Sequence, residues 1–129
     1  MKIYLASFLE KDNHGPGRKI AIANPKTTKI SGVLEYFMPE NRILNGYKAL
    51  QQSDQKLAAE FFVSSYRHQL DKFIDGLRKS AKEENTTMME QLPLEEGDTL
   101  LSWERYDFTN YRSILAEYLM DIGYDVVAR

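Results

Sequence analysis

Two short segments carry most of the residues in this sequence that could bind a ligand. Each segment lies at the end of a predicted strand, an apolar one at residues 3–8 and another at residues 99–103. In parallel α/β sheets, ligands bind outside the carboxyl ends of the strands, where loops lead into helix N-termini. We therefore expect a binding site between the two loops. Its predicted residues are Ser7, Arg18, Trp103, Glu104, Asn110 and Arg112.

The chemistry that these residues favour is the binding of an anion. A helix predicted to begin at Thr109 would carry about +0.5 of an elementary charge at its N-terminus, together with free N–H groups. The Arg112 guanidinium could bind a phosphate or carboxylate group beside it. Arg112 could equally pair with Glu104 or Asp107 and only order the loop, and the sequence leaves both interpretations open.

Motifs for catalysis or metal binding do not appear in the sequence. There are no cysteines, and the two histidines, His14 and His68, belong to no nucleophile, acid–base or metal motif. The Gly15-Pro16-Gly17 segment lacks the spacing of a P-loop and predicts an ordinary turn. The sequence thus predicts no cofactor, no metal and no catalytic residue, and it favours binding over turnover.

Composition limits the partners of the chain. The 129 residues predict one domain over residues 1–129, and the formal charge of −2 gives no overall attraction to nucleic acid. The apolar run at the amino end is too short for a signal peptide and stops at Glu10, and no run is long enough to span a membrane. We expect a cytoplasmic protein that binds neither membranes nor nucleic acid.

Hydrophobic periodicity predicts the elements that position these residues. Strands are expected at residues 3–8, 19–23, 99–103 and 124–127, with helices running from an N-cap at Ser53 to about Leu77 and from Thr109 to Gly123. Residues 26–51 fit short helical turns or a strand at 32–36 equally well. The strand–helix–strand order at the carboxyl end predicts a parallel pair. The fold class predicted is α/β, a small three-layer, Rossmann-like domain with a mostly parallel sheet.

A family resemblance rests on the last third of the chain. Residues 100–104, Leu-Leu-Ser-Trp-Glu, lead through a short loop to Asn110-Tyr111-Arg112 and to a helix closing on Gly123-Tyr124-Asp125-Val126. This pattern resembles the bacterial and phage family called domain of unknown function 488. Looser similarity extends upstream, at residues 17–22, 37–39, 44 and 47–48. The resemblance implies a three-layer α/β fold.

The chain departs from that pattern where thiol chemistry would occur. The family's cysteines correspond to Ser102 and Asn110 and its histidine to Tyr111, whereas Glu104 and Arg112 match. Chemistry that used a thiolate or imidazole at these positions cannot proceed here through the same atoms.

Three functions remain as hypotheses. The first is a non-catalytic domain that binds a small anion, a nucleotide or a phosphate metabolite, with Arg112 and Arg18 as charge partners and Trp103 or Tyr106 as a stacking surface. The second is a phage or accessory interaction module, an inhibitor that docks on a protein partner through exposed aromatic residues such as Tyr36, Phe37 and Tyr47. The third is a nucleotide- or nucleic-acid-processing enzyme that uses Glu104, Asp107 or Tyr111.

Overall fold

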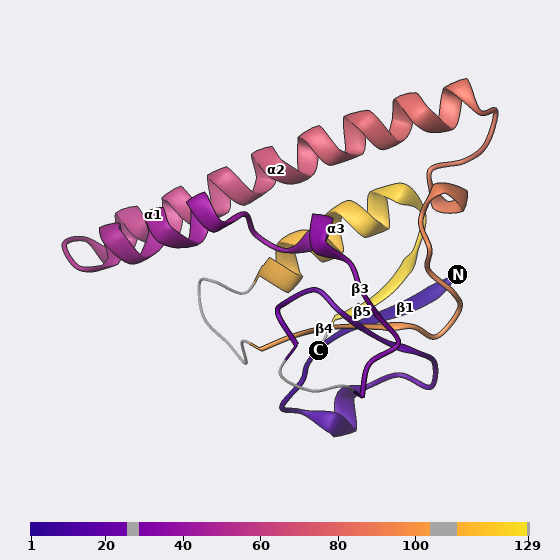
Figure 1. The fold of residues 1–129 in the computed structure, drawn as a ribbon, viewed down its shortest axis with the longest axis horizontal. Coiled ribbons are helices and arrows are strands. Elements are labelled where there is room, and N and C mark those ends of the chain that lie inside the picture. The colour runs from indigo at the N-terminus through magenta and orange to yellow at the C-terminus, as the bar shows by residue number, and fades with distance from the viewer. Residues whose placement is uncertain (26–28, 104–110, 129) are drawn as a thin grey trace.

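A five-stranded sheet with α-helices on one side forms the described part of the protein (Figure 1). The computed structural model describes residues 1–25, 29–103 and 111–128. The elements in chain order are β1 (Lys2–Ser7), η1 (Lys11–Asn13), β2 (Lys19–Ala21), β3 (Gly32–Val33), η2 (Glu35–Phe37), α1 (Asn41–Gln51), α2 (Gln55–Glu83), η3 (Met89–Gln91), β4 (Thr99–Ser102), α3 (Tyr111–Ile122) and β5 (Asp125–Ala128), where η marks a 3₁₀ helix.

The sheet is parallel throughout the described residues. Its strand order is β3-β2-β4-β1-β5, so β1 lies between β4 and β5. All four residues of β4 are buried, as expected for a central strand of a parallel sheet. The predicted α/β class and the predicted parallel sheet are therefore confirmed.

Helices pack on one face of the sheet, and the segment that follows β1 packs on the other. Ile3, Leu5 and Leu100 belong to the core that packs under the helices. Strand alternation turns Tyr4 and Thr99 to the other face. There the segment after β1 lies against them, because the Gly15 N–H donates to Thr99 Oγ1 at 2.7 Å and a Cβ on Gly15 would overlap the Tyr4 ring.

The Rossmann-like part of the fold prediction is not confirmed. Figure 1 shows the helices α1, α2 and α3 above the level of the sheet and the indigo segment that contains η1 below it. The layers are thus a loop, a sheet and helices, whereas a Rossmann-like domain has helices on both faces.

The long helix α2 confirms the predicted amphipathic pattern and corrects its first turn. Phe62, Tyr66 and Leu70 are fully or almost fully buried. The N-cap is Asp54, whose side chain accepts a hydrogen bond from the Leu57 N–H at 3.1 Å, and not Ser53 as predicted. The Ser53 hydroxyl instead donates to the Leu50 carbonyl at the end of α1, so that Asp54 is the residue free to cap α2.

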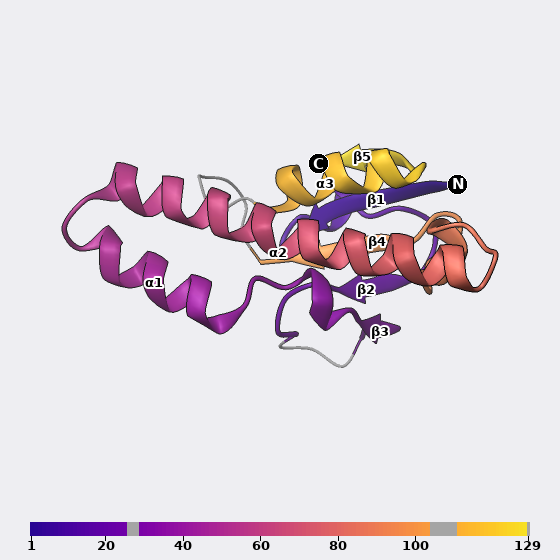
Figure 2. The same ribbon diagram turned by 90° about the horizontal axis from the view of Figure 1, so that it is seen from above.

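The ambiguous segment before α2 contains a strand, a 3₁₀ turn and a helix. Among the described residues 29–51, β3 and η2 take up the stretch that fitted either a strand or helical turns, and α1 follows. Helices α1 and α2 form a hairpin that extends beyond the sheet (Figure 2). Both local predictions were therefore partly right.

The strand–helix–strand unit at the carboxyl end is present. Strands β4 and β5 are both parallel to β1, and α3 connects to β5 through Gly123, whose φ of +126° favours glycine. The predicted cap Thr109 lies outside the described residues. In the described part of the chain no helix has the length and apolar character that a membrane span requires.

Candidate functional site

The carboxyl ends of β1 and β4 lie side by side, and consecutive side chains there point to opposite faces of the sheet. Ser7 is in register with Ser102, and both are fully buried. Alternation places these two serines with Leu5 and Leu100 on the helix side. The next residue of each strand, Phe8 or Trp103, is directed to the opposite face.

Phe8 and Trp103 form a stacked pair on that face. Their ring centroids are 4.4 Å apart with an interplanar angle of 26°. The indole Nε1–H donates to the Asn24 carbonyl at 2.8 Å, and this hydrogen bond restricts the orientation of the ring. Trp103 therefore offers a rigid aromatic surface beside the sheet.

A cleft of about 380 Å³ opens at this aromatic pair, and we call it the basic cleft. It is lined by Phe8, Lys11, His14, Lys19, Lys29, Leu101 and Trp103. Three of these residues are lysines, and the described lining contains no carboxylate. Among the described residues, neither Lys11 nor Lys19 forms an ion pair. Positive charge is thus concentrated here, although the chain as a whole carries a formal charge of −2.

His14 is oriented by the strand that precedes it. Its Nε2 lies 2.8 Å from the Ser7 carbonyl oxygen. Because a carbonyl oxygen only accepts hydrogen bonds, Nε2 is the donor, and this contact holds the imidazole against the end of β1. His68, in contrast, is exposed on α2, as the sequence predicted.

The other predicted polar residues lie on the helix side of the sheet. Ser7 Oγ accepts a hydrogen bond from the Leu9 N–H at 3.1 Å, and Ser102 Oγ is buried with no hydrogen-bond partner in the described part of the chain. Arg112, the second residue of α3, is only 3% exposed. Of the four predicted residues that the structure describes, only Trp103 lines the basic cleft. Glu104 and Asn110 lie outside the described residues, as do Tyr106 and Asp107.

Arg18 is held at the amino edge of the sheet instead. Its Nη2 donates to Asp98 Oδ2 at 2.7 Å and its Nε to Asp98 Oδ1 at 3.1 Å. The hydrogen bond to Asp98 is the main cause that raises the pKa of Arg18. Burial of Asp98 opposes its ionisation, but hydrogen bonds from Arg18 and from the Glu95 N–H outweigh this and hold the pKa of Asp98 below its ordinary value. The structure therefore does not bring Arg18 together with Trp103.

Sequence reasoning did not assign Phe8, Lys19, Lys29 or Leu101 to a binding site, although all four line the basic cleft. Lys19 directly follows Arg18, and adjacent strand residues point to opposite faces. The alternation of side chains along a strand could have indicated these residues. It places Phe8, Lys19 and Trp103 on one face of the sheet once β1, β2 and β4 are known to be neighbours.

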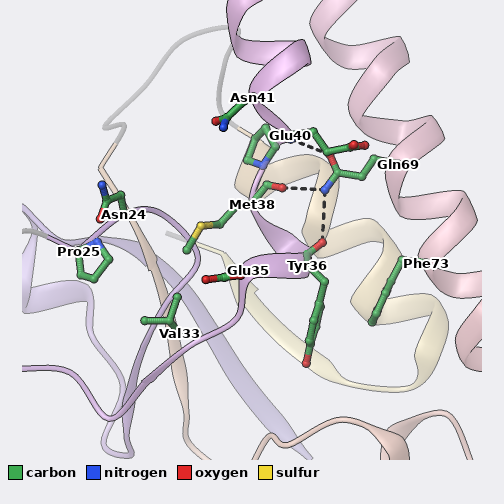
Figure 3. A pocket seen from close by; sticks show the side chains of 11 residues that line it. Asn24, Pro25, Val33, Glu35, Tyr36, Met38, Glu40, Asn41, Gln69 and Phe73 are labelled. Carbon is green, nitrogen blue, oxygen red and sulfur yellow. Dashed lines mark hydrogen bonds between the residues drawn. The ribbon is translucent and has the colours of Figure 1, made fainter.

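A second and larger groove lies between the start of the helical hairpin and the edge of the sheet (Figure 3). Its volume is about 660 Å³. Gln69 of α2 organises one wall, because its Nε2 donates to the carbonyls of Tyr36 and Met38 and its Oε1 accepts from the Glu40 N–H. The rings of Tyr36 and Phe73 stack beside it at 4.6 Å. We call this site the Glu35 groove, after the carboxylate within it.

Replacing Gln69 by leucine should lower the free energy of unfolding by about 1.5 kcal/mol, because three hydrogen bonds to backbone groups are lost while the side-chain volume is kept. Urea denaturation followed by circular dichroism measures the change. Gln55→Leu, at an exposed position in the first turn of α2, is the matched control and should change stability by less than about 0.5 kcal/mol. Equal effects of both variants would show that the contacts of Gln69 do not stabilise the fold.

The aromatic residues expected to form a docking surface are not all exposed. Phe37 is 1% and Tyr47 is 7% exposed, since both belong to the core, and Tyr36 is half-buried against Phe73. The proposed acid or base Tyr111 is also buried, and its hydroxyl donates to the Ile22 carbonyl at 2.8 Å. These positions correct the expectation that Phe37 and Tyr47 present an exposed patch, and they give Tyr111 a packing role.

Compared with known protein families, curated proteins and solved structures, the chain matches none of them. The resemblance to the domain of unknown function 488 family stays a prediction.

Proposed function

We propose that this protein binds a small phosphate-bearing molecule, a nucleotide or a phosphate metabolite, in the basic cleft. The observation that carries the proposal is the gathering of three lysines and a histidine around the Phe8 and Trp103 rings. Lysine ammonium groups bind phosphate oxygens as point charges, and a fixed indole ring can stack against a nucleobase. An anion in this cleft would meet no carboxylate from the described lining residues.

Two observations support binding without turnover. A serine nucleophile needs a base within hydrogen-bond reach, whereas Ser102 lies on the helix side of the sheet and its Oγ has no hydrogen-bond partner among the described residues. The imidazole of His14 already donates to a backbone carbonyl and has no carboxylate partner in the described part of the chain. The residues that line the basic cleft therefore supply charge and stacking and no activated nucleophile.

Fluorescence of Trp103 tests this proposal at the cleft itself, because the chain has one tryptophan. Titration with ADP should quench the emission. The double variant Lys11→Ala/Lys19→Ala should bind ADP at least about tenfold more weakly, since each lysine would contribute a charge-assisted contact. Raising the salt concentration should weaken binding to the parent protein as well.

The matched control is Lys56→Ala/Lys79→Ala, which removes the same charge from exposed positions of α2. This variant should retain the affinity of the parent protein. An absence of quenching by ADP and by a sugar phosphate would refute the proposal. Equal weakening in both double variants would do the same, because it would mean that only net charge matters.

A further inference from the structure

The Glu35 groove differs from the basic cleft in its charge. Its described lining contains two carboxylates, Glu35 and Glu40, and no lysine or arginine. Glu40 is already paired with Arg42, whose Nη2 lies 3.3 Å from Glu40 Oε1. Glu35 is exposed and forms no ion pair with the described residues. Glu35 therefore leaves a negative charge in the groove.

The side chains around Glu35 are mostly apolar. Figure 3 shows its carboxylate between Met38 and Val33 and directed toward Asn24 and Pro25. Val33 is 40% exposed in the edge strand β3, so its side chain is accessible to a ligand in the groove. The Met38 thioether is polarizable and adapts to the shape of a bound group. A ligand that complements this surface needs an aliphatic body with a positive charge at one end.

The remaining wall adds shape without adding charge. Tyr36 and Phe73 stack with an interplanar angle of 11°, and burial raises the pKa of Tyr36, so its phenol stays neutral at ordinary pH. Gln69 has its amide groups committed to Tyr36, Met38 and Glu40. Binding in the groove would therefore depend on Glu35 for its charge and on Met38 and Val33 for its apolar contact.

We propose that the Glu35 groove binds a small aliphatic cation, with an ammonium or guanidinium group against the Glu35 carboxylate and a short methylene chain along Met38 and Val33. The volume of about 660 Å³ lies within the range of small-molecule sites and leaves room for such a ligand. The opposite charge distinguishes this ligand from the phosphate-bearing molecule proposed for the basic cleft.

The two sites are separated by the segment that contains Asn24. Its backbone carbonyl accepts from Trp103 in the wall of the basic cleft, and Asn24 itself lines the Glu35 groove. The inference about the cation does not depend on whether the basic cleft binds a nucleotide. A variant of the groove can therefore be examined with ADP as a separate measurement.

Agmatine is the probe for this proposal, because it carries a guanidinium and an ammonium group on a four-carbon chain. The protein labelled with ¹³C at the methionine methyl groups reports binding through the Met38 signal, which Met38→Leu assigns. Agmatine should shift that signal saturably, and butylurea, a neutral molecule of similar length, should shift it much less. Glu35→Gln should weaken agmatine binding by about fivefold or more, as expected for loss of one partly exposed charge contact.

The control variant is Glu83→Gln, at an exposed glutamate in the last turn of α2, which should leave agmatine binding unchanged. Quenching of Trp103 by ADP should be the same in Glu35→Gln as in the parent protein. Equal binding of agmatine and butylurea, or equal weakening by both glutamate variants, would overturn the proposal. Binding of the peptide acetyl-Gly-Arg-Gly-amide at least tenfold tighter than agmatine would also overturn it, because the ligand would then be a peptide chain.

Discussion

Replacing Tyr66 by alanine should lower the free energy of unfolding by about 4 kcal/mol, which is the largest effect that we expect from one substitution. Tyr66 has the largest volume of the fully buried side chains among the described residues. Its ring packs edge-on against Tyr111 at 5.4 Å, and its hydroxyl donates to the Phe37 carbonyl. The ring thus joins α2 to the first turn of α3 and to the end of η2, and its removal leaves a cavity at that junction.

Urea denaturation separates the ring from the hydroxyl group. Tyr66→Phe keeps the ring and should cost only about 1 kcal/mol, because it removes the hydrogen bond from the hydroxyl to the Phe37 carbonyl. Since small domains are stable by roughly 5–15 kcal/mol, Tyr66→Ala should remove a large fraction of the total stability. Similar losses in both variants would show that the hydroxyl, and not the packing of the ring, provides the stability.

Asp98→Ala should lower the free energy of unfolding by about 3 kcal/mol at pH 7. The Asp98 side chain is 1% exposed, and its oxygens accept hydrogen bonds from the Arg18 guanidinium, the Arg18 N–H and the Glu95 N–H. Removing the carboxylate leaves the Glu95 N–H without this acceptor at the amino edge of β4. Asp75→Ala, which removes an aspartate that is 77% exposed and 3.5 Å from Arg78, should change stability by less than about 0.5 kcal/mol.

The effect of Asp98 should depend on pH in a defined direction. Its pKa is lowered in the folded protein, so the ionised carboxylate stabilises the fold fully above the unfolded-state pKa of about 4. This stabilisation is lost as the pH falls through the folded-state pKa, which lies lower. The difference between the parent protein and Asp98→Ala should therefore be constant near neutral pH and narrow below about pH 4. A difference that stayed constant to pH 2 would exclude ionisation as its source.

Local patterns were sufficient for the elements whose residues are strongly periodic. The repeat of Phe62, Tyr66 and Leu70 predicted α2, and the short strand-like stretch of residues 99–103 after the Gly97 turn predicted β4. Local patterns did not identify the N-cap of α2, where two adjacent residues can both cap a helix. Asp54 caps α2 in place of Ser53, because Ser53 is engaged with the end of α1, and that contact depends on the turn between the two helices.

The aromatic residues before α2 were harder to place from sequence. Phe37 and Tyr47 were predicted to be exposed and to contact a protein partner, but both are buried in the core beside the α1–α2 hairpin. Whether an aromatic side chain in this segment is buried depends on which helix packs against it. The periodicity of one short segment carries little information about the position of that helix.

The fold class and the main strands and helices follow from the sequence, because hydrophobic periodicity depends on residues that are close together in the chain. The expectation of a site at the carboxyl ends of β1 and β4 follows from the general geometry of parallel sheets. Tertiary structure alone decided which side chains share a face. It turned Trp103 and Lys19 toward the basic cleft, held Arg18 at Asp98 and set Ser7 and Ser102 on the helix side. The physical reason is that strand order and register join segments distant in the chain, and a shift of one residue would reverse every face.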